Sequence, residues 1–412
     1  MKKGSTMLRT MLLCSLVASI YGFGQEDEND WDKKASFGGL KREKAIAFSV
    51  GNYGYVGMGV DTAEVTHKDL WQYNPTTNTW TQVASLPGSE RRNAIAFSIE
   101  NKGYVGTGFS HDNSEIGHKL KDLWSYDPIL NSWDSLAAYP GGGDTGIYQA
   151  TAFSALGKAY VACGKIGSDN YITEVWQYDP VTDEWTPRTP FPGGNRYQLV
   201  SFVVENKAYV GLGTDHDIFR KDFYEYDPVT NTWETAPELP GSERAQGSAF
   251  SIGSKGFVVF GSDGGYKDEL WEFNYYTQTW TARAPFPGGG RKHAIAFSIA
   301  DTGYAGLGKE SDGKKQSFYA YYPILPVGID ETDNIKIDLF PNPAQDYVQI
   351  QPSEYLINYS IEIYGLNGMR VHTESYSGPV TLDVSDINKG GYLLIIRNDS
   401  NEIISTKKIT IL

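Results

Sequence analysis

The twelve-residue segment Asp122-Leu-Trp-Ser-Tyr-Asp-Pro-Ile-Leu-Asn-Ser-Trp133 recurs along the chain, and we call this repeated segment the phrase. Full copies occupy residues 69–80, 174–185, 222–233 and 269–280, and a truncated copy occupies 317–323. The Trp residues that end the five full copies are spaced 53, 52, 48 and 47 residues apart. A period near fifty indicates one supersecondary unit that is repeated, because a single unit cannot bury its apolar face alone.

Each repeat has the pattern of four short strands. In the second copy an apolar run at 94–98 indicates a strand buried on both sides, and Gly103-Tyr-Val-Gly-Thr-Gly108 follows a turn. The third strand is 122–126, where Asp-Pro then begins a turn, and the fourth starts at Trp133. The 45 Gly, 28 Tyr and 10 Trp residues also favour short strands joined by tight turns. We therefore expect an all-β protein.

The Gly-Tyr-Val-x-x-Gly motif, followed by a variable loop and by the phrase at 122–133, resembles the kelch repeat. The resemblance covers about residues 31–323 and recurs six times. Kelch repeats are the four-stranded blades of β-propellers, so the resemblance implies a six-bladed kelch β-propeller, which we place at 25–323.

The two ends of the repeat array support six blades independently. Six copies contain the first three strands, but only five fourth strands follow them. The segment from Trp31 to Ser49 aligns without a gap to the segment from Trp80 to Ser98. We therefore expect the strand at Trp31 to complete the last blade, which removes an exposed edge strand.

The first residues have the features of a secretory signal. Lys2, Lys3 and Arg9 precede an apolar run of about ten residues, 11–20, and small residues follow it. Such a run is too short to span a bilayer. We expect a signal peptide at 1–24 and no transmembrane segment in the mature chain.

The repeat stops at Pro323, and residues 324–336 have the composition of a linker. Residues 337–412 contain short alternating or apolar runs between turn signals, which predict a small Ig-like β-sandwich. Leu339-Phe-Pro-Asn-Pro-Ala344, the segment 383–392 and the terminal Lys407-Lys-Ile-Thr-Ile411 resemble the C-terminal sorting domain of the type IX secretion system. The resemblance implies export across the outer membrane of a Bacteroidota-type cell, with the secretion machinery as a partner and a secreted or cell-surface location. Whether the tail is cleaved or exchanged for an anchor stays open.

Charge and cysteine content narrow the function further. The formal net charge of −14 opposes binding to nucleic acid or to an anionic membrane. Cys163 lies at a mostly apolar strand position of the repeat and is expected to be a core thiol. The His residues show no ligand spacing, so we expect no metal and no cofactor. Galactose-oxidase-like enzymes share the propeller, but the copper site implied by that resemblance is not expected here.

Variable loops between second and third strands, together with the links between blades, are expected on one face of the disc, here called the loop face. An Arg recurs there at five of six equivalent positions, namely Arg42, Arg91, Arg196, Arg244 and Arg291. The residues two positions later are all polar, namely Lys44, Asn93, Gln149, Gln198, Gln246 and His293. Period-two alternation predicts that Arg91 and Asn93 share one side of their strand. A ring of donors at the channel mouth favours an anionic or hydroxyl-rich ligand.

An alternative for the Arg residues is structural. Acidic residues begin the third strands on the same face, so each Arg can pair with a carboxylate of its own repeat. Glu174 has no matching Arg, because Ile147 stands there, and Arg291 has Ser317 where the other copies have an acid. Arg291 with His293 is therefore the predicted free cation at the mouth.

Aromatic residues fall into two groups. Those that repeat with the blade, including the phrase Trp residues, are expected to pack between blades. Loop aromatics that do not repeat are better candidates for ligand contact, namely Tyr148, Tyr171, Tyr197, Phe219 and Tyr266.

These observations predict a propeller that binds a glycan or a protein at the channel mouth. A rival class is a sugar-active enzyme, since six-bladed kelch propellers include N-acetylneuraminate (sialic acid) epimerases, and an Arg ring suits a carboxylated sugar. A purely structural surface protein is a third possibility. A fold shared by many activities does not choose among them.

Overall fold

The computed structural model describes residues 29–112, 117–216, 218–323, 335–353, 355–365, 370–399 and 403–412. The expected signal peptide, 1–24, lies outside the described residues, as does most of the expected linker. Within the described residues the only helical element is the 3-10 turn η1 (Gly143–Thr145), so the predicted all-β class is confirmed.

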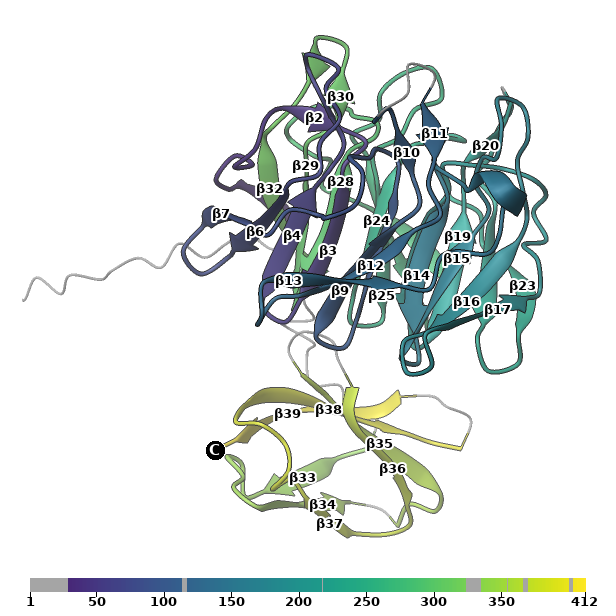
Figure 1. The fold of residues 1–412 in the computed structure, drawn as a ribbon. Coiled ribbons are helices and arrows are strands. Elements are labelled where there is room, and N and C mark those ends of the chain that lie inside the picture. The colour runs from purple at the N-terminus through teal and green to yellow at the C-terminus, as the bar shows by residue number, and fades with distance from the viewer. Residues whose placement is uncertain are drawn as a thin grey trace, which may run out of the picture.

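Described residues 29–323 form six antiparallel four-stranded sheets, which are the blades (Figure 1). In five blades the strands lie in chain order from the channel outward. The first blade contains β3 (Ile46–Val50), β4 (Tyr53–Gly57), β6 (Leu70–Asn74) and β7 (Thr79–Val83), and the second contains β8 (Ile95–Ile99), β9 (Lys102–Gly106), β12 (Leu123–Asp127) and β13 (Ser132–Leu136). The third contains β14 (Thr151–Ala155), β15 (Lys158–Ala162), β16 (Val175–Asp179) and β17 (Glu184–Arg188), and the fourth contains β18 (Val200–Val204), β19 (Lys207–Gly211), β22 (Phe223–Asp227) and β23 (Thr232–Ala236). The fifth contains β24 (Ser248–Ile252), β25 (Lys255–Val259), β26 (Leu270–Asn274) and β27 (Thr279–Arg283).

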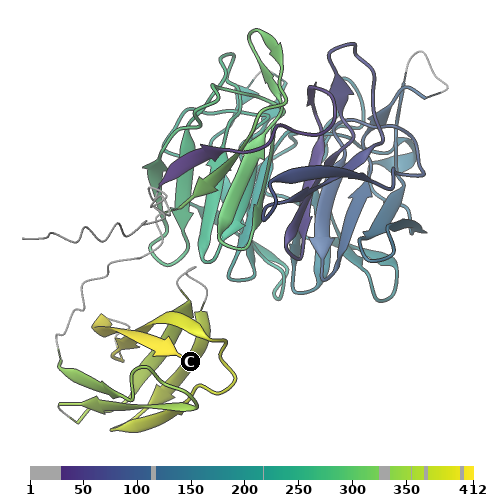
Figure 2. The same ribbon diagram turned by 90° about the vertical axis from the view of Figure 1, so that its left-hand side faces the viewer.

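The sixth blade is built from both ends of the repeat array. Its strands are β28 (Ile295–Ile299), β29 (Thr302–Gly306), β32 (Phe318–Tyr322) and β1 (Asp30–Lys33). The antiparallel register of β1 and β32 sets Trp31 opposite Tyr321. Each inner strand contacts the inner strand of the next blade, and β28 contacts β3, so the ring is closed (Figure 2).

Each blade packs its inner-strand Phe against its neighbour. Inner strands alternate buried and half-buried residues, and Phe48 of β3 stacks on Tyr55 of β4 with centroids 5.1 Å apart. The ring of Phe48 also lies against Gly103 of the next blade, where an added Cβ would clash with it. Close packing, rather than a turn, therefore favours a residue with little or no side chain at this position, which is Gly here and Ala in two other blades.

The Trp that ends each phrase joins two blades. Its Nε1 donates to a backbone carbonyl of the preceding blade at 2.8–3.0 Å, as Trp133 does to Ala84. Trp31 makes the equivalent bond, from Nε1 to the carbonyl of Ala284 at 2.9 Å. Repetition of these Trp residues thus reflects contact between blades, as the sequence predicted.

Short paired strands lie on the loop face, three pairs within second-to-third loops and one pair between the link that enters the first blade and the loop of that blade. These pairs are β2 (Arg42–Glu43) with β5 (Val60–Asp61), β10 (Phe109–Ser110) with β11 (His118–Lys119), β20 (Thr214–Asp215) with β21 (Ile218–Phe219), and β30 (Lys309–Glu310) with β31 (Gly313–Lys314). Figure 1 shows them along one side of the disc, away from the short turns between third and fourth strands. They stiffen a face that would otherwise consist of irregular loops.

The tail forms two further sheets. One contains β33 (Ile337–Phe340), β34 (Tyr347–Pro352) and β37 (Val380–Asp383), and the other contains β36 (Arg370–Tyr376), β35 (Tyr359–Gly365), β38 (Gly390–Arg397) and β39 (Ile403–Ile411). Buried side chains from both sheets, among them Ile350, Ile361 and Leu394, share one core. The tail therefore has a hydrophobic core of its own.

Candidate binding face

The five Arg residues of the predicted ring are buried, with exposed fractions of 0–2%. Arg91 shows the common arrangement: its two terminal nitrogens contact the two carboxylate oxygens of Asp122 at 2.8 and 2.6 Å. The same guanidinium also donates to the carbonyls of Thr107 and Ser89 at 3.1 and 3.2 Å. Arg42 and Arg196 bind Asp69 and Asp222 in the same way.

These contacts favour the structural alternative for the Arg ring. A bidentate Arg–carboxylate pair that also satisfies backbone carbonyls has few donors left for a ligand. Arg244 pairs with Glu269 through one terminal nitrogen, and its Nε donates to the carbonyl of Ser242 at 3.0 Å. In the blades that contain these Arg residues, the guanidinium group joins the link that enters the blade to the start of its third strand.

Arg291 is not the free cation that the sequence predicted. Its Nε donates to Glu310 Oε1 at 3.1 Å, and a terminal nitrogen donates to Ser317 Oγ at 2.7 Å. The carboxylate missing from the third strand is replaced by one from the loop strand β30. In the blade without an Arg, Glu174 instead accepts from Trp176 Nε1 at 3.0 Å and from Gly142 N at 3.1 Å.

The six polar residues two positions later form a backbone ring at the channel mouth. All six have positive φ, from 50° at His293 to 64° at Gln246. The N–H of each donates to the carbonyl of its equivalent in the preceding blade, at 2.9–3.3 Å, and Lys44 N to His293 O closes the circle. The left-handed backbone breaks the strand alternation expected here, so Arg91 and Asn93 do not share one side of a strand. We call these residues the mouth ring, namely Lys44, Asn93, Gln149, Gln198, Gln246 and His293.

Side chains of the mouth ring are linked across the mouth. Gln246 Nε2 donates to Gln198 Oε1 at 3.1 Å, and Gln198 Nε2 lies 3.1 Å from His293 Nε2. His293 Nδ1 lies 3.2 Å from Glu43 Oε2. With Gln198 as donor, His293 accepts at Nε2 and carries its proton at Nδ1, toward Glu43. Within the described residues, Gln246 Oε1 is buried and has no hydrogen-bond partner, and we call this unsatisfied oxygen the open acceptor of the mouth.

Charge at the mouth is set by burial and by Glu43. Burial lowers the pKa of His293, despite the adjacent carboxylate, so the ring is neutral at pH 7. Glu43 is also buried, but His293 and the nearby Lys44 and Lys314 lower its pKa to about 2. The mouth therefore contains a fixed carboxylate and a neutral imidazole held in one tautomer.

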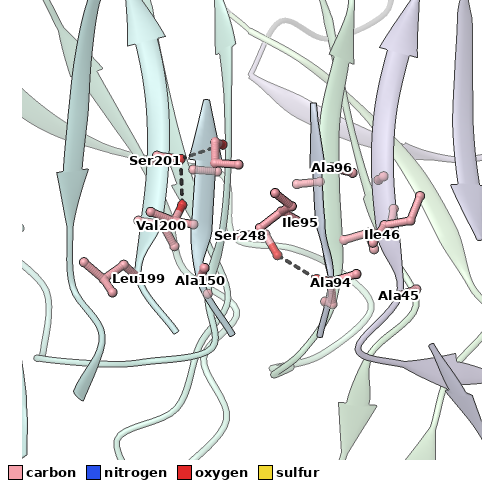
Figure 3. A pocket seen from close by; sticks show the side chains of 18 residues that line it. Ala45, Ile46, Ala94, Ile95, Ala96, Ala150, Leu199, Val200, Ser201 and Ser248 are labelled. Carbon is pink, nitrogen blue, oxygen red and sulfur yellow. Dashed lines mark hydrogen bonds between the residues drawn. The ribbon is translucent and has the colours of Figure 1, made fainter. Parts of the chain in front are cut away.

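Below the mouth ring the channel is narrow and lined by small residues. Three consecutive residues at the start of each inner strand surround a cavity of about 210 Å³, among them Ala45, Ala94 and Ala150 (Figure 3). Its few hydroxyls are satisfied: Thr151 and Ser201 bond to each other at 2.7 Å, and Ser248 donates to the carbonyl of Ala294 at 2.8 Å. The channel offers few side-chain groups for chemistry, which leaves the mouth and the loops as the candidate site.

Three of the five loop aromatics named from the sequence come together around one cation. Lys165 Nζ lies 4.5 Å from the ring centroid of Tyr197, 5.2 Å from that of Tyr171 and 5.9 Å from that of Tyr148. The rings of Tyr171 and Tyr197 are 4.7 Å apart. We call these four residues the tyrosine–lysine cluster. Tyr266 instead lies under Lys292, at 5.5 Å.

Lys165 was missed by the sequence reasoning. The sequence does indicate that Lys165 begins a loop on the loop face, because it directly follows the Cys163-Gly164 pair that ends the second-strand motif. Cys163 itself is fully buried, as predicted for a core thiol, and burial raises its pKa to about 12. Among the described residues no group of three or more His, Cys, Asp or Glu side chains could hold a metal ion.

Comparison with known proteins agrees with the fold. Residues 54–87 match the Kelch motif model, and residues 338–412 match the model of the secretion system C-terminal sorting domain. A solved structure of YjhT shares the fold with a TM-score of 0.59 at 16% identity, covering 69% of this chain and 95% of that one. Kelch-like protein 35 of Mus musculus is 31% identical over 105 residues, which is 25% of this chain and 17% of the mouse protein. The chain thus spans less than a fifth of the length of that curated relative.

The class of protein follows from these findings: it is a kelch β-propeller with a type IX secretion sorting domain. The protein is accordingly a secreted kelch protein, delivered to the cell surface or the extracellular space. In the part of the chain that the structure describes, no helix is long and apolar enough to cross a membrane.

Proposed function

We propose that the exported propeller binds a glycan at the mouth of its channel and acts as a recognition module rather than as an enzyme. The observation that carries this proposal is the mouth ring with its open acceptor, Gln246 Oε1. The proposal keeps the chain organisation expected from the sequence, with a leader at 1–24, the propeller at 25–323, a linker at 324–336 and the sorting tail at 337–412.

The chemistry of the mouth ring suits hydroxyl groups. Carboxamides such as those of Asn93 and Gln149 both donate and accept hydrogen bonds, as sugar hydroxyls do. A hydroxyl that donates to Gln246 Oε1 would satisfy a buried acceptor, and an unsatisfied buried acceptor costs about 1–3 kcal/mol. The buried Arg–carboxylate pairs hold the backbone of the ring and so reduce the ordering cost of binding. A protein ligand with exposed Asn, Ser or Thr side chains is the alternative occupant.

A sugar-active enzyme that resembles an N-acetylneuraminate epimerase is the second candidate. His293 with Glu43 favours it, because a carboxylate that orients an imidazole is a common acid–base arrangement. Burial of Arg42, Arg91 and Arg291 speaks against it, because the cations expected to hold a sugar carboxylate are already paired.

The test is a glycan array probed with the exported full chain and with two variants. Gln246→Leu removes the open acceptor, and Val181→Ser is the control, since Val181 is exposed in a turn between third and fourth strands. Binding by the wild type and by V181S, with loss in Q246L, supports the proposal. If neither the array nor a matching protein array gives a ligand, the recognition function is wrong. Accelerated anomer exchange of N-acetylneuraminate, followed by NMR and lost in His293→Gln, would replace it with the enzyme.

A further inference from the structure

We propose that the tyrosine–lysine cluster is a subsite for a sugar ring that carries a carboxylate, with Tyr171 and Tyr197 against the ring and Lys165 against the carboxylate. This inference rests on the proposed glycan binding and narrows the ligand class to acidic glycans.

Separate segments of the loop face bring the cluster together. Tyr148 lies in the link that enters β14, and Lys165 and Tyr171 lie in the second-to-third loop of the same blade. Backbone bridges pair Lys165 with Tyr148 and with Tyr171. Tyr197 lies in the link that enters the next blade, one residue before Gln198 of the mouth ring. The cluster therefore adjoins the mouth and would extend the same binding surface.

Lys165 differs from the Arg residues in its partners. Each of the five Arg residues is paired with a carboxylate, whereas Lys165 makes no ion pair within the described residues. The residue is half-buried, and its Nζ lies among three aromatic rings. Burial lowers the pKa of Lys165, and the carboxylate of Asp169 acts in the opposite direction. A partly desolvated cation without a bonded anion is a favourable partner for a ligand carboxylate.

The three tyrosines offer what a sugar ring needs. The three residues are half-buried, and aromatic rings offer apolar faces to the C–H groups of a pyranose. Tyr171 also lies beside the ring of His216, at 5.1 Å between centroids, which adds a polar group at the edge of the cluster.

The fold does not require tyrosine at these positions. The equivalents of Tyr148 and Tyr197 in the other four blades are Glu43, Arg92, Ala245 and Lys292, and each is followed by a residue of the mouth ring. Because the backbone ring forms with Glu, Arg, Ala or Lys at this position, packing alone does not explain the two tyrosines. A ligand contact explains why two adjacent blades place aromatic rings against one lysine.

Paired probes test the inference on the exported full chain. Affinities for tri-galacturonate and for the neutral galactotriose would be measured by isothermal titration calorimetry. Wild type is expected to prefer the acidic trimer. Lys165→Gln should weaken the acidic trimer by about tenfold and leave the neutral one unchanged, as loss of one charge-assisted contact predicts. Tyr197→Ala should weaken both.

Lys292→Gln is the matched control, because it removes one positive charge from the same face, above a single tyrosine. Its affinities should stay within about twofold of wild type, since rim charges outside a site contribute little. Thermal unfolding of each variant shows that it is folded. If K165Q and K292Q weaken the acidic trimer equally, or if neither does, the subsite is wrong. If array glycans bind and Q246L abolishes their binding but K165Q and Y197A have no effect, the inference fails and the proposed function stands. Absence of any glycan ligand overturns both.

Discussion

The indole Nε1 of Trp31 donates a 2.9 Å hydrogen bond to the carbonyl of Ala284, 253 residues further along the chain. Asn29 adds two contacts, because its Oδ1 accepts from Ala284 N at 3.1 Å and from the hydroxyl of Tyr321 at 3.0 Å. In the first blade Asn78 and Trp80 make the same set of bonds with Ala35 and Tyr73. The start of the described chain therefore occupies in the sixth blade the place that a repeat strand occupies in the others, and it joins both ends of the ring.

Trp31→Ala should destabilise the propeller by about 3–5 kcal/mol, because it removes a buried aromatic side chain and an inter-blade hydrogen bond. Trp31→Phe keeps most of the apolar contact but loses the hydrogen bond. The loss of that bond should cost about 1 kcal/mol, in addition to the free energy of the lost packing volume. Urea unfolding monitored by circular dichroism measures both. An unchanged midpoint for W31A would mean that the sixth blade is stable without β1.

Gly103→Ala should destabilise the propeller by about 1–3 kcal/mol, because the added methyl meets the ring of Phe48. Ala159 holds the equivalent position in the third blade. The reverse change, Ala159→Gly, should cost no more than about 1 kcal/mol, which is the usual price of a strand glycine. Equal and small effects of the two changes would show that blade spacing adapts freely at this contact.

Arg91→Leu should lower the unfolding free energy by about 3 kcal/mol, because Asp122 loses its bidentate partner and two carbonyls lose a donor. The double variant Arg91→Leu, Asp122→Leu should recover part of that loss. Chemical denaturation measures the coupling between the two sites. If R91L is as stable as the wild type but loses ligand binding, Arg91 contacts the ligand and its pairing with Asp122 is not its main role.

Stability near neutral pH should depend on His293. Burial lowers its pKa below the ordinary 6.5, so the unfolded chain binds a proton at a higher pH than the folded chain does. The contribution of the neutral His293 to the free energy of unfolding is complete above pH 6.5. It declines as the pH falls below that value toward the pKa of the folded state. Glu43, with a pKa of about 2, stays ionised over this range, so the charge of this neighbouring carboxylate does not change.

The measurement is the unfolding free energy at about pH 7.5 and about pH 5.5 for wild type and for His293→Gln. Wild type should lose up to about 1 kcal/mol more than the variant over this interval. A wild type that gains stability on acidification relative to H293Q would show that His293 is protonated in the folded protein and bound to Glu43 as an ion pair.

The blades could be predicted from the sequence because the residues that form and pack each blade recur at equivalent positions in every copy of the repeat. Six copies of the second-strand motif and five terminal Trp residues indicate strand order, inter-blade packing and the role of Trp31. The pairing of Arg91 with Asp122 was also accessible, because both residues recur together on one face of the repeat.

The site was less predictable because it depends on departures from the repeat. The left-handed backbone at Asn93 is set by a hydrogen bond to Lys44 of the preceding blade, which no local pattern of the strand indicates. Arg291 pairs with Glu310, a carboxylate in the second-to-third loop, and the repeated strand pattern does not indicate that position. Lys165 and its three tyrosines meet only because loops of two blades converge.

Hydrogen–deuterium exchange with mass spectrometry, on the exported protein with and without an array-derived glycan, tests most directly where the ligand binds. We expect ligand-induced protection in peptides that cover the mouth ring and the tyrosine–lysine cluster, around residues 42–45, 91–94, 146–149, 163–172, 196–199, 244–247 and 291–294. Turns between third and fourth strands, such as 127–132 and 179–184, should exchange at unchanged rates. Protection confined to those turns or to the tail, with none on the loop face, would contradict the account.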